Sequence, residues 1–151
     1  MFERILVPLD GSQVSEMVVP YAVELASMFN SSIVVAGVSD SSGWQAIVEC
    51  RSYLENQSDK IKDSLKKKLP EAEENLPHAQ VHFQCLIGNP ASEILNYASK
   101  IDCSLIILAS RGASGGGAWP LGSVADKILR ASNCPVLLVR EHLDDETIAL
   151  R

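Results

Sequence analysis

The sequence has no apolar run approaching the roughly 20 residues that a membrane-spanning helix needs. It also has no apolar signal region behind a basic start, because a strand-like segment follows residues 1–4 directly. Basic residues are scarce, since 13 of them against 19 acidic residues give a formal net charge of −6. Binding to nucleic acid or to an anionic membrane is therefore disfavoured, because both depend on a basic surface. These absences predict a soluble, cytoplasmic protein that uses neither partner.

Cysteine motifs are missing as well. The four cysteines form no C-x-x-C pair, and none lies at metal-ligand spacing from a histidine. Cys85, Cys103 and Cys134 lie within or beside apolar runs, so we expect them to be buried small hydrophobic residues in a reducing compartment. Cys50 is expected to be exposed, and we identify no partner that would activate it.

The sequence does have short apolar runs that alternate with helical patterns. Its 151 residues, 46% of them hydrophobic and 21% charged, suit one globular domain. Helices are predicted at 12–29, 45–68 and 123–132 and from Pro90 onward, and strands at 5–7, 33–38, 81–86, 105–109 and 135–139. Pro20 should kink the first helix or shift its start. The pattern predicts an α/β fold: a single doubly wound domain over 1–140, with helices on both faces of a parallel sheet and a polar tail at 141–151.

Glycine is concentrated in one loop. Five of the nine glycines fall between positions 112 and 122, after the apolar run 105–109 and before a helix. Such a loop lets backbone N–H groups converge, and Ser123, with Asp126 three residues later, can cap the helix as in a capping box. Free N–H groups at a helix N-terminus attract phosphate. The loop therefore predicts a phosphate site, with a plain connector and an ordinary cap as the alternative.

Two well-known phosphate loops are excluded by the residues present. A Walker A loop needs Lys and Ser/Thr after its last glycine, whereas Ser123 and Val124 follow Gly122 here. A dinucleotide fingerprint follows the first strand, and the first turn of this chain has a single glycine. Backbone amides, hydroxyls and the guanidinium of Arg111 would hold the phosphate instead, although Arg111 could equally be a solvated loop cation.

The sequence resembles the universal stress protein family over nearly its whole length. The matching segments are Ile5–Ser12, Gly88–Ile94, Ala109–Gly112, Gly122–Val124 and Cys134–Val139. The nucleotide-binding branch of that family carries Gly-x-x-Gly, nine residues, and then Gly-Ser/Thr. Gly112, Gly122 and Ser123 match this motif, whereas Ala109 replaces its first glycine. The added methyl of Ala109 could weaken nucleotide binding without abolishing it.

The resemblance implies a sheet of order 3-2-1-4-5 and ATP, with or without Mg²⁺, in the crevice between strands 1 and 4. It also implies a homodimer through the last strand and a role in the stress response. The implied nucleotide contacts are Pro8, Leu9 and Asp10 at the adenosine, Val38 at the adenine, Leu108 and Ala109 at the ribose, and Arg111, Gly112, Gly122, Ser123 and Val124 at the phosphates. For Asp10 a purely turn-forming role stays open.

Catalytic groups are not evident beside the glycine loop. The sequence offers no clear general base there and no second acidic motif for Mg²⁺. We therefore predict a nucleotide-binding regulatory protein that is not an enzyme, with slow ATP hydrolysis at most. The alternative is a universal stress protein that binds no nucleotide and acts as a dimeric interaction module. Retained Gly112, Gly122 and Ser123 favour the first prediction, and Ala109 favours the second.

Overall fold

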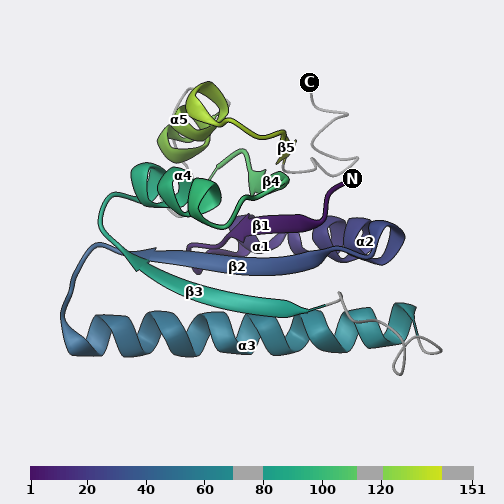
Figure 1. The fold of residues 1–151 in the computed structure, drawn as a ribbon. Coiled ribbons are helices and arrows are strands. Elements are labelled where there is room, and N and C mark those ends of the chain that lie inside the picture. The colour runs from purple at the N-terminus through teal and green to yellow at the C-terminus, as the bar shows by residue number, and fades with distance from the viewer. Residues whose placement is uncertain (70–79, 112–120, 141–151) are drawn as a thin grey trace, which may run out of the picture.

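The structure is a computed structural model that describes residues 1–69, 80–111 and 121–140. Strands and helices alternate along the chain (Figure 1). In chain order the elements are β1 (Arg4–Pro8), α1 (Gln13–Glu16), α2 (Val19–Phe29), β2 (Ser32–Ser39), α3 (Trp44–Lys68), β3 (Val81–Ile87), α4 (Pro90–Lys100), β4 (Leu105–Ala109), α5 (Ser123–Ala131) and β5 (Val136–Val139). The predicted tail at 141–151 lies outside the described residues.

The five strands form one parallel sheet with the order β3-β2-β1-β4-β5. This confirms the predicted fold class, strand number and strand order. All five residues of β4 are buried, as expected of an uncharged strand that helices cover on both faces. Strand β3, which lies at one edge of the sheet, has exposed side chains at its second and fourth positions between buried or half-buried ones, and β5 lies at the other edge.

Helices cover both faces of the sheet, as predicted (Figure 1). One core cluster joins Ile5, Val7 and Ile107 to buried residues of α2 and α3. The other joins Leu6 and Ile106 to buried residues of α4 and α5. Because successive residues of a strand point to opposite faces, the central strands supply side chains to both clusters.

The segment 12–29 differs from the single predicted helix. It forms two helices, because α1 ends at Glu16 and α2 starts at Val19 with Pro20 in its first turn. Proline is tolerated there, since the first N–H groups of a helix have no partner inside the helix. The alternative in which Pro20 shifts a helix start is therefore the one that the structure adopts.

The cysteines are buried less uniformly than predicted. Cys103 is buried, but Cys85 and Cys134 are only half-buried. The expectation that Cys50 is exposed was wrong, because its side chain packs half-buried against the core beneath α3. Helix periodicity alone did not reveal that position 50 faces the sheet.

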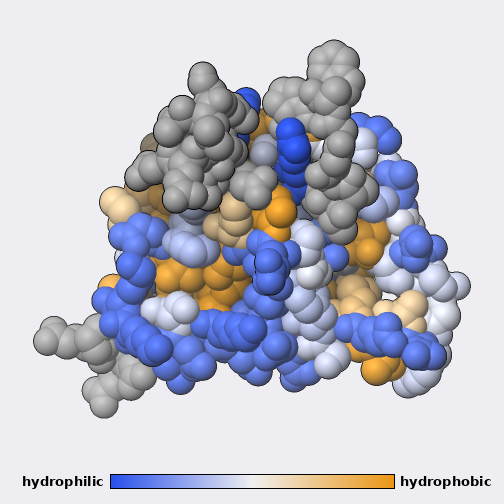
Figure 2. Space-filling model, turned by 180° about the vertical axis from the view of Figure 1, so that it is seen from behind, coloured by the Kyte–Doolittle hydropathy of each residue, from blue (hydrophilic) through white to orange (hydrophobic). Residues whose placement is uncertain are grey.

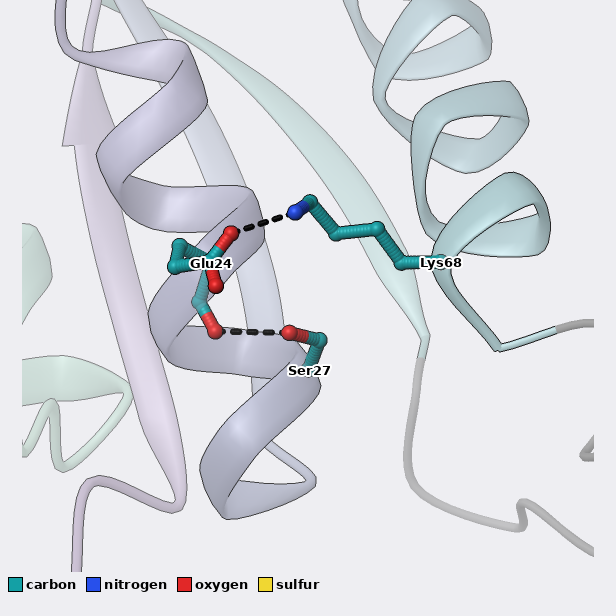
Figure 3. Close-up of polar contacts among 3 residues, drawn as sticks. All are labelled: Glu24, Ser27 and Lys68. Carbon is teal, nitrogen blue, oxygen red and sulfur yellow. Dashed lines mark hydrogen bonds and ion pairs between the residues drawn. The ribbon is translucent and has the colours of Figure 1, made fainter.

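Helices α2 and α3 lie on the same face of the sheet and are linked by an ion pair. Lys68 in the last turn of α3 forms an ion pair with Glu24 of α2 (Figure 3). The Glu24 carbonyl also accepts a hydrogen bond of 2.7 Å from the Ser27 hydroxyl. Both charged side chains are substantially exposed, so the pair contributes little free energy of folding, of order 0–1 kcal/mol.

On the face shown in Figure 2, the exposed hydrophobic residues form separate groups, each bordered by hydrophilic residues. The large exposed ones include Met28 on α2, Trp44 at the start of α3 and Leu137 on β5. Scattered exposed hydrophobic residues are ordinary on a protein surface. In the described ranges, no helix has the length and apolarity needed to cross a membrane.

Candidate functional site

The candidate site lies where the chain leaves the two central strands. The chain runs from β1 to β2 through α1 and α2 on one face of the sheet, and from β4 to β5 through α5 on the other face. Pairing between β1 and β4 covers only Ile5 and Leu6, whereas β1 pairs with β2 along all five of its residues. The two central strands therefore separate toward their carboxyl ends, at the kind of switch point where open α/β sheets bind ligands.

The turn after β1 forms one side of this site. The Asp10 carboxylate accepts hydrogen bonds from the Ser12 backbone N–H at 2.9 Å and from the Ser12 hydroxyl at 2.6 Å. Gly11 has a φ of +87°, a left-handed conformation that side chains disfavour. Ser12 in turn caps α1 by accepting from the Ser15 backbone N–H at 3.1 Å. Asp10 therefore has the turn-forming role that the sequence analysis left open.

A hydrogen-bond network ties this turn region to α3. Glu16 of α1 accepts hydrogen bonds from the Tyr53 hydroxyl at 2.7 Å and from the Gln57 side-chain amide at 3.0 Å. The pKa of Tyr53 is raised above its usual value, chiefly by burial and then by the carboxylate of Glu16 and the more distant charge of Asp10. A hydrogen bond from the Gly11 backbone acts in the opposite direction. Tyr53 is therefore a neutral hydrogen-bond donor that fixes α1 and the turn against α3.

We expect Tyr53→Phe to lower the free energy of unfolding by about 1–3 kcal/mol, because it leaves half-buried Glu16 without one of its donors. Urea unfolding at neutral pH measures the change. Tyr97→Phe is the matched control: Tyr97 is also half-buried, but in the described ranges its hydroxyl makes no side-chain hydrogen bond. Equal effects of the two substitutions would contradict the structural role given to the Tyr53 hydroxyl.

The opposite side of the site is built from the end of β4 and the start of α5. The Ser110 N–H donates to the Val139 carbonyl at 2.9 Å, and the Ser110 carbonyl accepts from the Gly122 N–H at 2.6 Å. Residues 110 and 122, on either side of segment 111–121, are therefore held together at the carboxyl end of β4. Residues 112–120, including Gly112, lie outside the described residues.

The cap of α5 differs from the prediction. Gly122, not Ser123, is the N-cap residue, and Ser123 is the first residue of the helix. Asp126 does not complete a capping box, because its carboxylate pairs with Arg130 one turn later, at 3.1 and 3.2 Å. Since glycine has no side chain to accept the first N–H groups, the cap residue itself leaves them available to an anion.

The predicted contact residues lie at the carboxyl edge of the sheet as follows. Leu9, Leu108 and Ala109 are buried, and Pro8, Val38, Arg111, Gly122 and Val124 are half-buried. Asp10 and Ser123 are exposed. The predicted residues therefore include some on each side of the crevice, at the turn after β1 and at the start of α5. Among them, only Gly112 lies outside the described residues.

Sequence reasoning missed the hydrogen-bonded group of Tyr53, Gln57 and Glu16. These three residues meet because Tyr53 and Gln57 of α3 reach Glu16 of α1 across 37 and 41 residues of sequence. A polar Gln57 beside buried Ser58, on the helix face that also carries buried Leu54 and Ile61, was the available signal. Buried polar residues require hydrogen-bond partners.

No group of three or more His, Cys, Asp or Glu side chains could hold a metal ion in the part of the chain that the structure describes. A protein-only metal centre is therefore not found among these residues.

Comparison with known proteins places the chain in a family. Residues 1–140 match the model of the universal stress protein family. The universal stress protein YxiE of Bacillus subtilis (strain 168) is 36% identical over 152 residues, covering 93% of this chain and 100% of that protein.

Solved structures share the fold at lower identity. A universal stress protein in complex with cAMP superposes with a TM-score of 0.70 at 21% identity, covering 92% of this chain and 97% of that one. The universal stress protein from Archaeoglobus fulgidus in complex with dAMP superposes with a TM-score of 0.67 at 19% identity, covering 91% and 98%. With the family model over residues 1–140 and the sheet order β3-β2-β1-β4-β5, this chain belongs to the universal stress protein family.

Proposed function

We propose that the protein is a regulatory universal stress protein that binds ATP, with or without Mg²⁺, in the crevice between β1 and β4. The observation that carries the proposal is the start of α5 beside the end of β4. There a glycine N-cap, linked to Ser110 at 2.6 Å, leaves the first amides of a nine-residue helix without a side-chain cap from that position. Such amides and the helix dipole suit a phosphate chain.

The residues around this point fit the parts of a nucleotide. Arg111 follows Ser110 directly and can add positive charge near the phosphates. Half-buried Val38, near the end of β2, offers apolar surface for an adenine ring, and the backbone of buried Leu9 lies at the same end of the sheet. Two family members of the same fold hold cAMP and dAMP, which belong to the ligand class proposed here.

The alternative is a universal stress protein that binds no nucleotide and acts through protein contacts. The observation that favours it is Ala109, which replaces the first glycine of the nucleotide-binding motif. However, the Ala109 side chain is only 8% exposed and belongs to the same core cluster as Leu9 and Val139. Since this methyl packs among protein side chains, we infer that it weakens nucleotide binding at most.

Mass spectrometry of ligand released from freshly purified protein by denaturation tests the function. Release of ATP, ADP or AMP supports ATP binding. Its absence, together with an unchanged melting temperature in millimolar ATP and Mg²⁺, contradicts the proposal and favours the interaction module. Quantifying ADP formed during incubation tests the further expectation that hydrolysis is slow at most. We expect the protein to act in the cytoplasm.

We also propose a homodimer through β5. Strand β5 is at the edge of the sheet, and its Leu137 side chain is 36% exposed. Bare apolar strand edges are usually paired or protected.

We expect a dimer in sedimentation at micromolar concentration and a monomer for Leu137→Lys, because lysine on an edge strand opposes pairing. Met28→Lys, on exposed Met28 of α2, is the control that should stay dimeric. A wild-type monomer, or a dimeric Leu137→Lys variant, would contradict this interface.

A further inference from the structure

Two cysteines far apart in the sequence meet at the amino-terminal end of the sheet, opposite the candidate nucleotide site. Cys103 precedes β4 and Cys134 precedes β5. Ile106 pairs with Val136 in register, and the Ile106 N–H donates to the Pro135 carbonyl at 3.0 Å. The two segments therefore run side by side where they enter the sheet, and both thiols pack in the core cluster under α4 and α5.

Both cysteines line one surface hollow of about 440 Å³. The ends of α4 and α5 form the rest of its wall, including Ser99 and Ser132. Cys134 is half-buried, and its Sγ lies 3.5 Å from the Ser132 hydroxyl, whereas the Cys103 side chain is almost fully enclosed. A small polar oxidant that enters the hollow therefore reaches Cys134 first and has Cys103 behind it.

The environment keeps Cys103 in the thiol form. Burial first, and then the neighbouring Cys134 thiol, raise the pKa of Cys103 to about 12. The Cys103 thiol also donates to the Leu105 carbonyl, with the sulfur 3.0 Å from that oxygen. This high pKa disfavours the thiolate, so Cys103 is not the thiol that reacts with oxidant first. Its role as the resolving thiol rests on its place beside the more accessible Cys134 in the same hollow.

We propose that Cys103 and Cys134 form an intramolecular disulfide when the protein meets hydrogen peroxide. The Cys134 sulfur attacks one peroxide oxygen, the O–O bond breaks, and Cys134 sulfenic acid and water form. The Cys103 sulfur then attacks the Cys134 sulfur and displaces hydroxide, which takes the Cys103 proton and leaves as a second water. Two thiols are oxidised to one disulfide, and one peroxide is reduced to two waters.

The new bond would close the chain from position 103 to position 134. This loop includes β4, α5 and every residue proposed for the phosphates, from Arg111 to Val124. Closing a loop of this length restricts the unfolded chain and stabilises the folded protein. We expect the melting temperature to rise by about 5–10 °C on oxidation and to return when reductant is added. This inference does not depend on nucleotide binding.

The test is intact-mass analysis of the full chain after peroxide treatment, denaturation and alkylation of free thiols. The matched control is Cys50→Ser with Cys85→Ser, which removes the other neighbouring thiol pair, between α3 and β3. In this double variant we expect a loss of about 2 Da, no alkylation, and full reversal by reductant. Peptide mapping should give one cross-link, between Cys103 and Cys134.

Cys134→Ser and Cys103→Ser, each added to the double variant and confirmed as folded by circular dichroism, should form no internal disulfide and show no oxidation-dependent rise in melting temperature. The proposal is wrong if the double variant is alkylated at both remaining cysteines after peroxide. It is also wrong if oxidation stops at sulfinic acid on Cys134, or yields only disulfide-linked dimers.

Discussion

Gly122→Val should weaken ATP binding at least about tenfold, the loss expected when one hydrogen bond to a charged phosphate is removed. Gly122 is the N-cap of α5, and its N–H donates to the Ser110 carbonyl at the point where the chain leaves and re-enters the sheet edge. A branched side chain there would occupy the space through which phosphates approach the first amides of the helix. Calorimetric titration with ATP measures the affinity.

The variant should still fold, because Gly122 has φ −69° and ψ 160°, an extended conformation that valine adopts readily. The substitution therefore acts by crowding, and not by forbidding a backbone conformation.

Gly43→Val is the matched control. Gly43 is the N-cap of α3, with φ −60° and ψ 137°, and a Cβ there meets only the rotatable Ser41 hydroxyl, at 3.2 Å. Both variants lose a glycine cap at similar cost to the helix, but only Gly122→Val should lose ATP affinity. Unchanged ATP affinity in Gly122→Val, with wild-type circular dichroism, would remove the start of α5 from the proposed site and favour the interaction module.

The fold could be predicted from local patterns because they agree with one another. An uncharged run such as Leu105–Ala109 is stable only where both faces are covered, so its sequence alone indicates a central strand. Asn89 and Pro90 likewise mark the start of α4, where the Asn89 side chain accepts from the Ser92 N–H at 3.2 Å. Strand order, by contrast, came from the family resemblance, because periodicity does not report which strands are neighbours.

The candidate site could be predicted only in part. The position of Gly122 after a buried strand indicated the start of α5, but the cap residue was misassigned by one position. Gly122 and Ser123 are both acceptable caps, and the choice follows from the hydrogen bond between Gly122 and Ser110, which sequence does not reveal. The contact of Tyr53 with Glu16 depends on where the fold places α3 relative to α1, which has no local signature in the sequence.

Ile107→Ala should lower the free energy of unfolding by about 2–5 kcal/mol, a large share of the roughly 5–15 kcal/mol typical of a domain. The Ile107 side chain is 0% exposed and lies in the core cluster under α2 and α3. Its strand, β4, has β1 on one side and β5 on the other, so the lost volume cannot be filled from solvent. Urea unfolding followed by circular dichroism measures the loss.

Leu137→Ala is the matched control, because Leu137 is the register partner of Ile107 on β5 yet is 36% exposed. In a monomer its removal should cost about 1 kcal/mol or less, since much of the side chain already contacts water. If β5 forms the proposed dimer interface, the same side chain is buried by the partner, and the cost should grow with protein concentration. A cost for Ile107→Ala as small as that for Leu137→Ala in dilute protein would mean that β4 is not the buried inner strand on which the fold and the proposed nucleotide site depend.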